Sequence, residues 1–274
     1  MLIKITQSCS MGCTHCCNNA VPCDNHMTMD TFKNVLDFIS KYDCSLMDAL
    51  AGGEPFEHPQ IWEFIDEYCK TFPEKILTVA TNGLYLQNNQ ELVHSKILQY
   101  PPLFFQVTND TRYYPQKLDL TKRIFRNKKV IVCTEVNHIY PKGRALINHR
   151  DIMGQKNKCP TCFNVKLMAL QRGDTGLDQI ISSLRLQGKN CIPSIQYDGS
   201  IAFGEYDECP GYVSIFSSEE EIIESMKNCK CECCPEMFEK LKSNIHNMLP
   251  NNFIEANKEY LSNLIGGSDD KESQ

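Results

Sequence analysis

The feature that most constrains the fold is an alternation of strand-length apolar runs with helical patterns along residues 1–150. Strands separated by helices run parallel in one sheet, because right-handed crossovers return the chain to the same side. Five or six strands fit before the alternation stops, so we expect an α/β fold built as an open, partial (β/α) barrel. The expected strands are Leu2–Thr6, Ser45–Ala51, Ile76–Ala80, Leu103–Thr108 and Lys129–Val136, and the expected helices are Met29–Lys41, Pro59–Thr71, Gln90–Gln99 and Asp119–Arg126.

The chain changes character from about residue 151, where cysteines become frequent. Two short strands, Ser194–Tyr197 and Ser200–Phe203, flank Asp198-Gly199, a pair that favours the tight turn of a β-hairpin. Helical patterns follow at Glu219–Lys227 and Pro235–Leu249. The last residues are polar and charged, which is typical of a disordered tail. The expected units are therefore a core at residues 1–150, a small cysteine-rich α+β extension at 151–265 and a disordered tail at 266–274.

Sixteen cysteines among 274 residues indicate either a disulfide-rich secreted protein or an intracellular protein that binds metal. Secretion signals begin with a charged segment and an apolar stretch, whereas Met1–Thr6 is predicted as a strand. We therefore expect a reducing, cytoplasmic compartment, where clustered thiols bind metal or carry out redox chemistry. The net charge of −6 disfavours nucleic-acid and anionic-membrane partners, and no apolar run approaches the length of a membrane span.

Three cysteines follow the first expected strand: Cys9, Cys13 and Cys16 are separated by three and two residues. Three thiolates so close on a loop can converge on three corners of an iron–sulfur cube, and Gly12 helps the loop to wrap around it. The fourth iron then lacks a protein ligand, and an open metal position is what a catalytic site needs. The spacing alone also permits a structural zinc site, whose fourth ligand would be one of His15, Cys17 and Cys23.

A Gly-Gly-Glu-Pro segment, residues 52–55, follows the second expected strand. Two glycines allow the backbone to approach a ligand closely, and Glu54 can accept a hydrogen bond from a ligand ammonium group. Taken alone, such a segment is more often a turn with a surface carboxylate. However, α/β folds bind ligands at the carboxyl ends of their parallel strands, and the cysteine loop leaves the sheet at that same edge. The position of the segment therefore favours one shared site.

The three cysteines and the Gly-Gly-Glu-Pro segment resemble the signatures of the radical S-adenosylmethionine (SAM) superfamily. The resemblance implies that Cys9, Cys13 and Cys16 hold a [4Fe-4S] cluster and that residues 52–55 hold the amino group of SAM. His15 stands before the third cysteine, where the family usually has an aromatic residue, and a flat imidazole can lie near an adenine. The cofactor-binding residues implied by the resemblance are His15, Gly52, Gly53, Glu54, Pro55, Thr81, Asn82, Gln106 and Thr108.

Three further segments extend the resemblance. Thr81-Asn82-Gly83, at the end of the third expected strand, resembles the Thr-Asn-Gly of the family. Residues 106–110 lie where the family places polar groups towards the SAM ribose. Residues 141–145, Pro-Lys-Gly-Arg-Ala, resemble the Gly-Arg-Ala stretch found in many members with extra clusters. The matches cover residues 1–150.

The C-terminal part resembles the cluster-binding extensions called SPASM and twitch domains, in which a cysteine precedes a hairpin with Asp-Gly at its turn. Cys191 and Cys209 flank the expected hairpin, whereas the position just after it, a cysteine in the family, is Gly204. The resemblance implies one or two auxiliary [4Fe-4S] clusters. Zinc held by four cysteines is the alternative, because it would satisfy the spacing equally well. The candidate ligands are Cys159, Cys162, Cys191, Cys209, Cys229, Cys231, Cys233 and Cys234.

The resemblance implies an enzyme in which the reduced cluster gives one electron to SAM. Methionine and a 5′-deoxyadenosyl radical result, and the radical removes a hydrogen atom from the substrate. Members with auxiliary clusters often modify peptides or proteins, so we expect peptide or protein maturation, with an electron donor of the flavodoxin or ferredoxin type. The alternatives are a small-molecule oxidoreductase or epimerase of the same superfamily and, from another class, a non-catalytic zinc-binding interaction protein.

Overall fold

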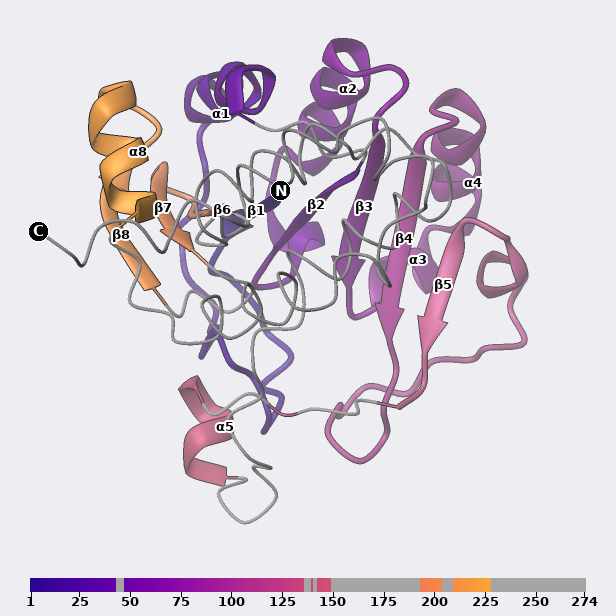
Figure 1. The fold of residues 1–274 in the computed structure, drawn as a ribbon. Helices are drawn as coiled ribbons and strands as arrows, with labels where there is room; N and C mark the ends of the chain where they lie inside the picture. The colour runs from indigo at the N-terminus through magenta and orange to yellow at the C-terminus, as the bar shows by residue number, and fades with distance from the viewer. Residues whose placement is uncertain (43–46, 136–138, 140–141, 149–192, 204–208, 228–274) are drawn as a thin grey trace, which may run out of the picture.

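The structure, a computed structural model, describes residues 1–42, 47–135, 139, 142–148, 193–203 and 209–227. Its strands are β1 (Leu2–Thr6), β2 (Met47–Gly52), β3 (Ile76–Thr81), β4 (Leu103–Thr108), β5 (Val130–Cys133), β6 (Pro193–Ile195), β7 (Ser200–Phe203) and β8 (Cys209–Ser214). They form one sheet in the order β5-β4-β3-β2-β1-β6-β7-β8 (Figure 1). The first six strands in this order run parallel to one another. Strand β7 pairs antiparallel with β6, and β8 pairs antiparallel with β7.

Most of the helices pack beside the sheet, whereas α5 lies apart from it (Figure 1). They are α1 (Met29–Tyr42), α2 (Ile61–Thr71), α3 (Leu84–Asn88), α4 (Gln90–Gln99), α5 (Gly143–Asn148) and α8 (Glu219–Lys227), with short 3-10 helices η1 (Pro55–Glu57) and η2 (Arg123–Arg126). Among the described residues, no helix is both long enough and apolar enough to cross a membrane.

The main hydrophobic core lies between the sheet and α1, α2 and α4. Val79 of β3 and Phe105 of β4 are fully buried in it, together with Phe32 of α1 and Phe64 of α2. The rings of Phe32 and Phe64 stack with their centroids 4.2 Å apart. Because side chains alternate between the two faces of a strand, the intervening residues of β3 and β4 point to the opposite face, where Gln106 is exposed. The core therefore fixes the sheet from one side.

The predicted α/β class with a mainly parallel sheet is confirmed. The predicted hairpin is also present, because β6 and β7 pair antiparallel on either side of Asp198-Gly199, and Gly199 has φ 83°. The hairpin continues the main sheet, since β6 pairs in parallel with β1. Strand β8 is not among the predicted elements. A division of the chain at residue 150 stays a prediction.

The helix predicted at Asp119–Arg126 is wrong over its first half, because only Arg123–Arg126 form a short 3-10 helix. Asp119 Oδ1 accepts hydrogen bonds from Thr121 N at 3.0 Å and from Thr121 Oγ1 at 2.6 Å. Such local side-chain bonds compete with the helical ladder. The predicted helix at 235–249 and the predicted tail lie outside the described residues.

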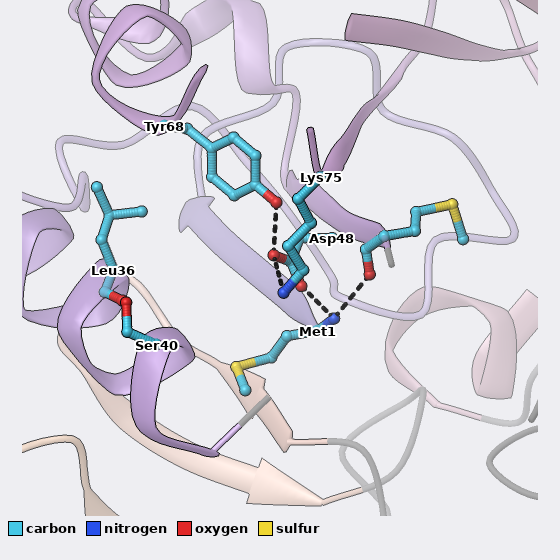
Figure 2. Close-up of polar contacts among 7 residues, drawn as sticks. Met1, Leu36, Ser40, Asp48, Tyr68 and Lys75 are labelled. Atoms are coloured by element: carbon cyan, nitrogen blue, oxygen red, sulfur yellow. Dashed lines mark hydrogen bonds and ion pairs between the residues drawn. The ribbon is translucent and has the colours of Figure 1, made fainter. Parts of the chain in front are cut away.

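Asp48 of β2 is a buried carboxylate near the end of the sheet where β2 begins (Figure 2). Its Oδ2 accepts a hydrogen bond from Tyr68 Oη at 2.6 Å and lies 2.9 Å from Lys75 Nζ. Its Oδ1 lies 2.5 Å from the amino group of Met1. A buried charge is tolerated only where opposite charges and hydrogen bonds compensate its lost hydration. Asp48 therefore ties the start of β2 to α2 and to the chain before β3.

We expect Asp48→Asn to lower the free energy of unfolding by about 3 kcal/mol, because removing one partner of a buried ion pair leaves its cations uncompensated. Urea unfolding of the purified protein measures the change. Asp66→Asn is the matched control, since Asp66 pairs with Lys96 at 2.8 Å but keeps 30% of its side chain exposed; we expect it to cost less than about 1 kcal/mol. Equal losses in the two variants would contradict the structural role of Asp48.

Candidate functional site

The predicted site segments gather at the carboxyl ends of β1, β2, β3 and β4, which are neighbours in the sheet. The cysteine loop, residues 9–16, follows β1. The Gly-Gly-Glu-Pro segment begins with the last residue of β2, and Thr81-Asn82-Gly83 begins with the last residue of β3. Parallel strands end on one edge of a sheet, which is where α/β proteins bind ligands. The structure therefore brings the three segments together: hydrogen bonds join the Gly-Gly-Glu-Pro segment to Thr81 and Asn82 and to Ser8, directly before the cysteine loop.

Gly52 and Gly53 press the end of β2 against the backbone that leaves β1. Gly53 N donates to Thr6 O at 2.7 Å, and Glu54 N donates to Ser8 O at 2.7 Å. A Cβ on Gly52 would lie 2.2 Å from Thr6 O, and one on Gly53 would lie 2.0 Å from Ser8 O. The backbone that leaves β1 therefore occupies the space that a side chain would need, and the close approach of these glycines to a ligand stays a prediction. Glycine is required here because two strand ends meet.

Glu57 of η1 holds the first half of the cysteine loop. Its Oε1 accepts hydrogen bonds from Ser10 N and Ser10 Oγ, both at 2.7 Å, and its Oε2 accepts one from Ser8 Oγ at 2.9 Å. Between these two serines, Cys9 N donates to Val21 O at 3.2 Å. The position of Cys9 is thus fixed from both sides by the short helix that follows β2.

Helix α5 holds the second half of the loop. Arg144 Nε donates to Cys13 O at 3.0 Å and Nη1 donates to Ala20 O at 2.7 Å, while Arg144 N donates to Cys16 O at 2.9 Å. Gly143 has φ 58°, and a Cβ there would lie 2.7 Å from Cys16 O. The Gly-Arg pair of residues 143–144 therefore has a physical role: glycine permits the close approach, and arginine bridges two loop carbonyls.

Two of the loop thiols lie where their ionised form is disfavoured unless a cation is present. Burial, reinforced by Glu57, raises the pKa of Cys9 to about 11, and burial with the neighbouring thiols raises the pKa of Cys13 to about 12. Metals bind the thiolate, and their own charge reverses this penalty. Two desolvated thiols, with that of Cys16 on the same loop, thus fit a metal cluster. In the part of the chain that the structure describes, no three His, Cys, Asp or Glu side chains form a site for a single ion; a four-iron cluster instead takes each thiolate on a separate iron.

Glu54 is 5% exposed, and neutral donors surround its carboxylate. Oε1 accepts from Thr81 Oγ1 at 2.7 Å and from Phe56 N at 3.2 Å, and Oε2 accepts from Asn82 N at 2.7 Å. Burial raises the pKa of Glu54 to about 7 despite these bonds. A carboxylate offers about four acceptor positions, so one remains for a ligand donor. Glu54 therefore links β2 to β3 and can also accept a hydrogen bond from a bound cation.

Thr81, Asn82 and Gly83 form a tight turn into α3. Thr81 Oγ1 accepts from Gly83 N at 3.1 Å, and Asn82 Oδ1 accepts from Leu84 N at 2.9 Å. Gly83 has φ 82°, and a Cβ there would lie 2.7 Å from Val107 Cγ1. The segment thus keeps the Thr81 hydroxyl and the Asn82 amide aimed at Glu54.

Gln106 and Thr108 occupy alternate positions of β4 and so share one face of the sheet. The hydroxyl of Thr108 forms a hydrogen bond with the Tyr114 side chain. The Tyr114 ring lies 4.5 Å from the ring of His15, measured between centroids, and Tyr113 lies 5.2 Å from it. His15, which the resemblance places near an adenine, therefore packs against two tyrosines that follow β4 and joins the cysteine loop to this segment.

Of the predicted ligands of the C-terminal part, Cys209 begins β8. The other seven lie outside the described residues: Cys159, Cys162, Cys191, Cys229, Cys231, Cys233 and Cys234.

Sequence reasoning missed three residues that shape this site: Glu57, Tyr114 and Arg144. Tyr113-Tyr114 offered a signal as a pair of aromatic residues in the loop that follows β4. Arg144 lies in the Pro-Lys-Gly-Arg-Ala stretch, but the sequence indicates no role for its side chain. Glu57 gave no signal, since a glutamate three residues after Glu54 reads as an ordinary surface residue.

An α/β sheet with a three-cysteine loop and a buried glutamate at adjacent strand ends defines a class of cofactor-binding domain. Residues 3–129 match the sequence model of the Radical SAM superfamily. This match lies over the residues that carry the motifs and agrees with their resemblance to that superfamily. No curated protein matches the sequence of the chain.

A comparison with solved structures finds, among others, three chains whose backbones align with this one along most of its length. BtrN in complex with AdoMet and 2-DOIA is 13% identical, with a TM-score of 0.49 over 87% of this chain and 84% of that one. BtrN in an open conformation is 13% identical, with a TM-score of 0.46 over 85% and 88%. The structure of anSMEcpe with bound AdoMet and the Cp18Cys peptide is 13% identical, with a TM-score of 0.37 over 97% and 98%.

We expect Gly53→Ala to cost at least about 3 kcal/mol of unfolding free energy, because its methyl group would overlap Ser8 O and force the strand ends apart. Gly12→Ala is the matched control: Gly12 has φ 67°, but nothing lies within 4 Å of the point that a Cβ would occupy there, so only the left-handed backbone penalty of about 1 kcal/mol applies. Urea unfolding compares the two. A Gly53 variant as stable as the Gly12 variant would contradict the close approach.

The raised pKa of Glu54 predicts a pH-dependent stability of the metal-free protein. Because the folded state binds the proton more tightly than the unfolded state, stability is highest below about pH 4.5 and falls as the pH rises to about 7, by about 3 kcal/mol from this group. Glu54→Gln should remove this contribution. Unfolding free energies measured at several pH values for both proteins check the slope; identical slopes would refute it.

Proposed function

We propose that the chain is a radical SAM enzyme that cleaves SAM reductively and uses the 5′-deoxyadenosyl radical to abstract hydrogen from a substrate. The superfamily match over residues 3–129 supports the proposal. The observation that carries it is the hydrogen bonding of Glu54 both to Ser8, directly before the cysteine loop, and to Thr81-Asn82. A cluster on the loop and SAM beside it would thus be held by one connected unit.

In the proposed enzyme Cys9, Cys13 and Cys16 hold a [4Fe-4S] cluster. When bound, the cluster supplies the electron that cleaves SAM. The chain contributes position and shielding: Glu57 and Arg144 fix the loop, and Cys13 is only 8% exposed. Shielding matters because a carbon radical must meet its substrate before it meets water or a stray hydrogen donor.

For SAM we propose that Glu54 accepts a hydrogen bond from the amino group. A positive charge at this position would favour the ionised carboxylate and so offset its burial. Gly52, Gly53 and Pro55 hold Glu54 in place between β2 and η1. Thr81 and Asn82 restrain its oxygens, and the remaining polar groups assigned to the pocket are His15, Gln106 and Thr108.

For the substrate we propose a peptide or a protein side chain, modified in the cytoplasm, with a flavodoxin- or ferredoxin-type protein as the electron donor. The support is the likeness of the C-terminal part to SPASM and twitch domains, including the hairpin turn at Asp198-Gly199. We propose that the cysteines after residue 158 bind one or two auxiliary [4Fe-4S] clusters in a region that begins near residue 151.

Replacing Cys9, Cys13 and Cys16 together by Ala should remove about four irons and four sulfides per chain, the content of one four-iron cluster. It should also abolish formation of 5′-deoxyadenosine from SAM under dithionite. Iron and sulfide analysis of anaerobically reconstituted protein, with chromatography of the nucleoside, measures both. Cys69→Ala is the matched control, because Cys69 is a buried cysteine within α2; it should retain full iron content.

The same triple variant tests the C-terminal part, because any iron it keeps must lie elsewhere in the chain. Retained iron with the absorption of an iron–sulfur protein supports auxiliary clusters. Zinc without iron makes the C-terminal cysteines a structural zinc site. Cleavage of SAM by the triple variant would refute the proposed cluster ligands.

A further inference from the structure

Two side chains of opposite charge hold the cysteine loop at its two halves. Glu57 binds the loop on either side of Cys9, through Ser8 and Ser10, with three hydrogen bonds of 2.7–2.9 Å. Arg144 binds the carbonyls of Cys13 and Ala20 through its guanidinium. Both side chains are half-buried, so solvent screens them less than a surface ion.

The two charges also lie beside the residues that carry the thiols. Glu57 Oε1 accepts a hydrogen bond from Ser10 N, the amide next to Cys9, at 2.7 Å, and Arg144 Nε donates to the carbonyl of Cys13 itself at 3.0 Å. A negative charge beside a cluster disfavours adding an electron to it, and a positive charge favours it. Reduction potentials of iron–sulfur clusters depend on such charges and on hydrogen bonding around the cluster. Glu57 and Arg144 should therefore act on the potential in opposite directions.

We propose that Glu57 and Arg144 are paired positioning residues that fix the cysteine loop and set, in opposite senses, how readily its cluster is reduced. Glu57 makes reduction harder and so makes the reduced cluster a stronger donor. Arg144 raises the reduction potential from the side of Cys13, so that a protein electron donor can still reduce the cluster. The inference rests on the proposed function, because it requires a cluster on Cys9, Cys13 and Cys16.

The test is a redox titration of reconstituted full-length protein without SAM, followed by electron paramagnetic resonance. It monitors the signal that the triple cysteine variant lacks. Glu57→Gln should shift the midpoint potential to a more positive value, and Arg144→Gln should shift it to a more negative value. Glu91→Gln and Arg123→Gln are matched controls, since they change net charge equally but lie exposed on α4 and η2. Neither control should shift the potential.

Charge-conserving variants separate position from charge. Arg144→Lys keeps the charge but loses the planar fork that spans two carbonyls, so its potential should stay closer to wild type than that of Arg144→Gln. In the metal-free protein, alkylation of Cys13 should be several-fold faster in Arg144→Lys than in wild type, because the loop has lost an anchor. An unchanged alkylation rate would overturn the positioning role.

The two proposals fail in different ways. A wild-type protein with no cluster signal beyond that of the triple variant would refute the proposed function. A normal wild-type signal, with potentials in Glu57→Gln and Arg144→Gln that stay at the wild-type value or move in the same direction, would refute this inference alone. If either glutamine variant cannot hold its cluster, the alkylation rates of the metal-free proteins decide, and rates equal to wild type overturn the proposal.

Discussion

The meeting of two backbones at the carboxyl edge of the sheet determines where everything else in the site can lie. Gly53 N and Glu54 N bond to the carbonyls of Thr6 and Ser8, at a distance that leaves no space for a side chain. The pairing of β1 with β2 also shifts register between Lys4 and Thr6, an irregularity of the kind often found beside functional sites. One strand leads into the thiols and the other into the buried glutamate. Main-chain hydrogen bonds therefore set the relative position of the two strand ends, and the side chains of Glu57 and Arg144 then fix the loop between them.

Strand β2 has a buried carboxylate near each end, and the two have different surroundings. Asp48 meets the cations of Lys75 and Met1, so its charge is compensated within the chain. Glu54 meets only neutral donors among the described residues, and burial raises its pKa to about 7. Asp48 therefore stabilises the fold by itself. The buried charge of Glu54 is not compensated by a cation among the described residues, and a bound cation can compensate it. The desolvated thiols of Cys9 and Cys13 require a cation in the same way, which marks this edge of the sheet as the functional one.

Sequence patterns predicted the parallel sheet, the hairpin and the meeting of the motifs, because hydrophobic alternation and Asp-Gly turns are local features. They failed at Asp119–Arg126, where side-chain hydrogen bonds of Asp119 replace a helical turn. They could not show that Gly52 and Gly53 also let two strand ends meet, since only the register of β1 against β2 shows which backbone lies there. They also could not find Glu57, whose partners Ser8 and Ser10 lie far from it in sequence and are brought close only by the sheet.

The parallel pairing of β6 with β1 has a consequence for how the chain acquires its structure. Leu2 pairs with Ser194, so one side of β1 lacks this neighbour until the chain has been synthesised to about residue 194. Pairings so distant in sequence are slow to form because a long loop must close first. Through most of synthesis β1 therefore presents an open strand edge, a template for pairing with other chains. We expect production of this protein to depend on keeping that edge of β1 unpaired with other chains until the hairpin of β6 and β7 has been synthesised.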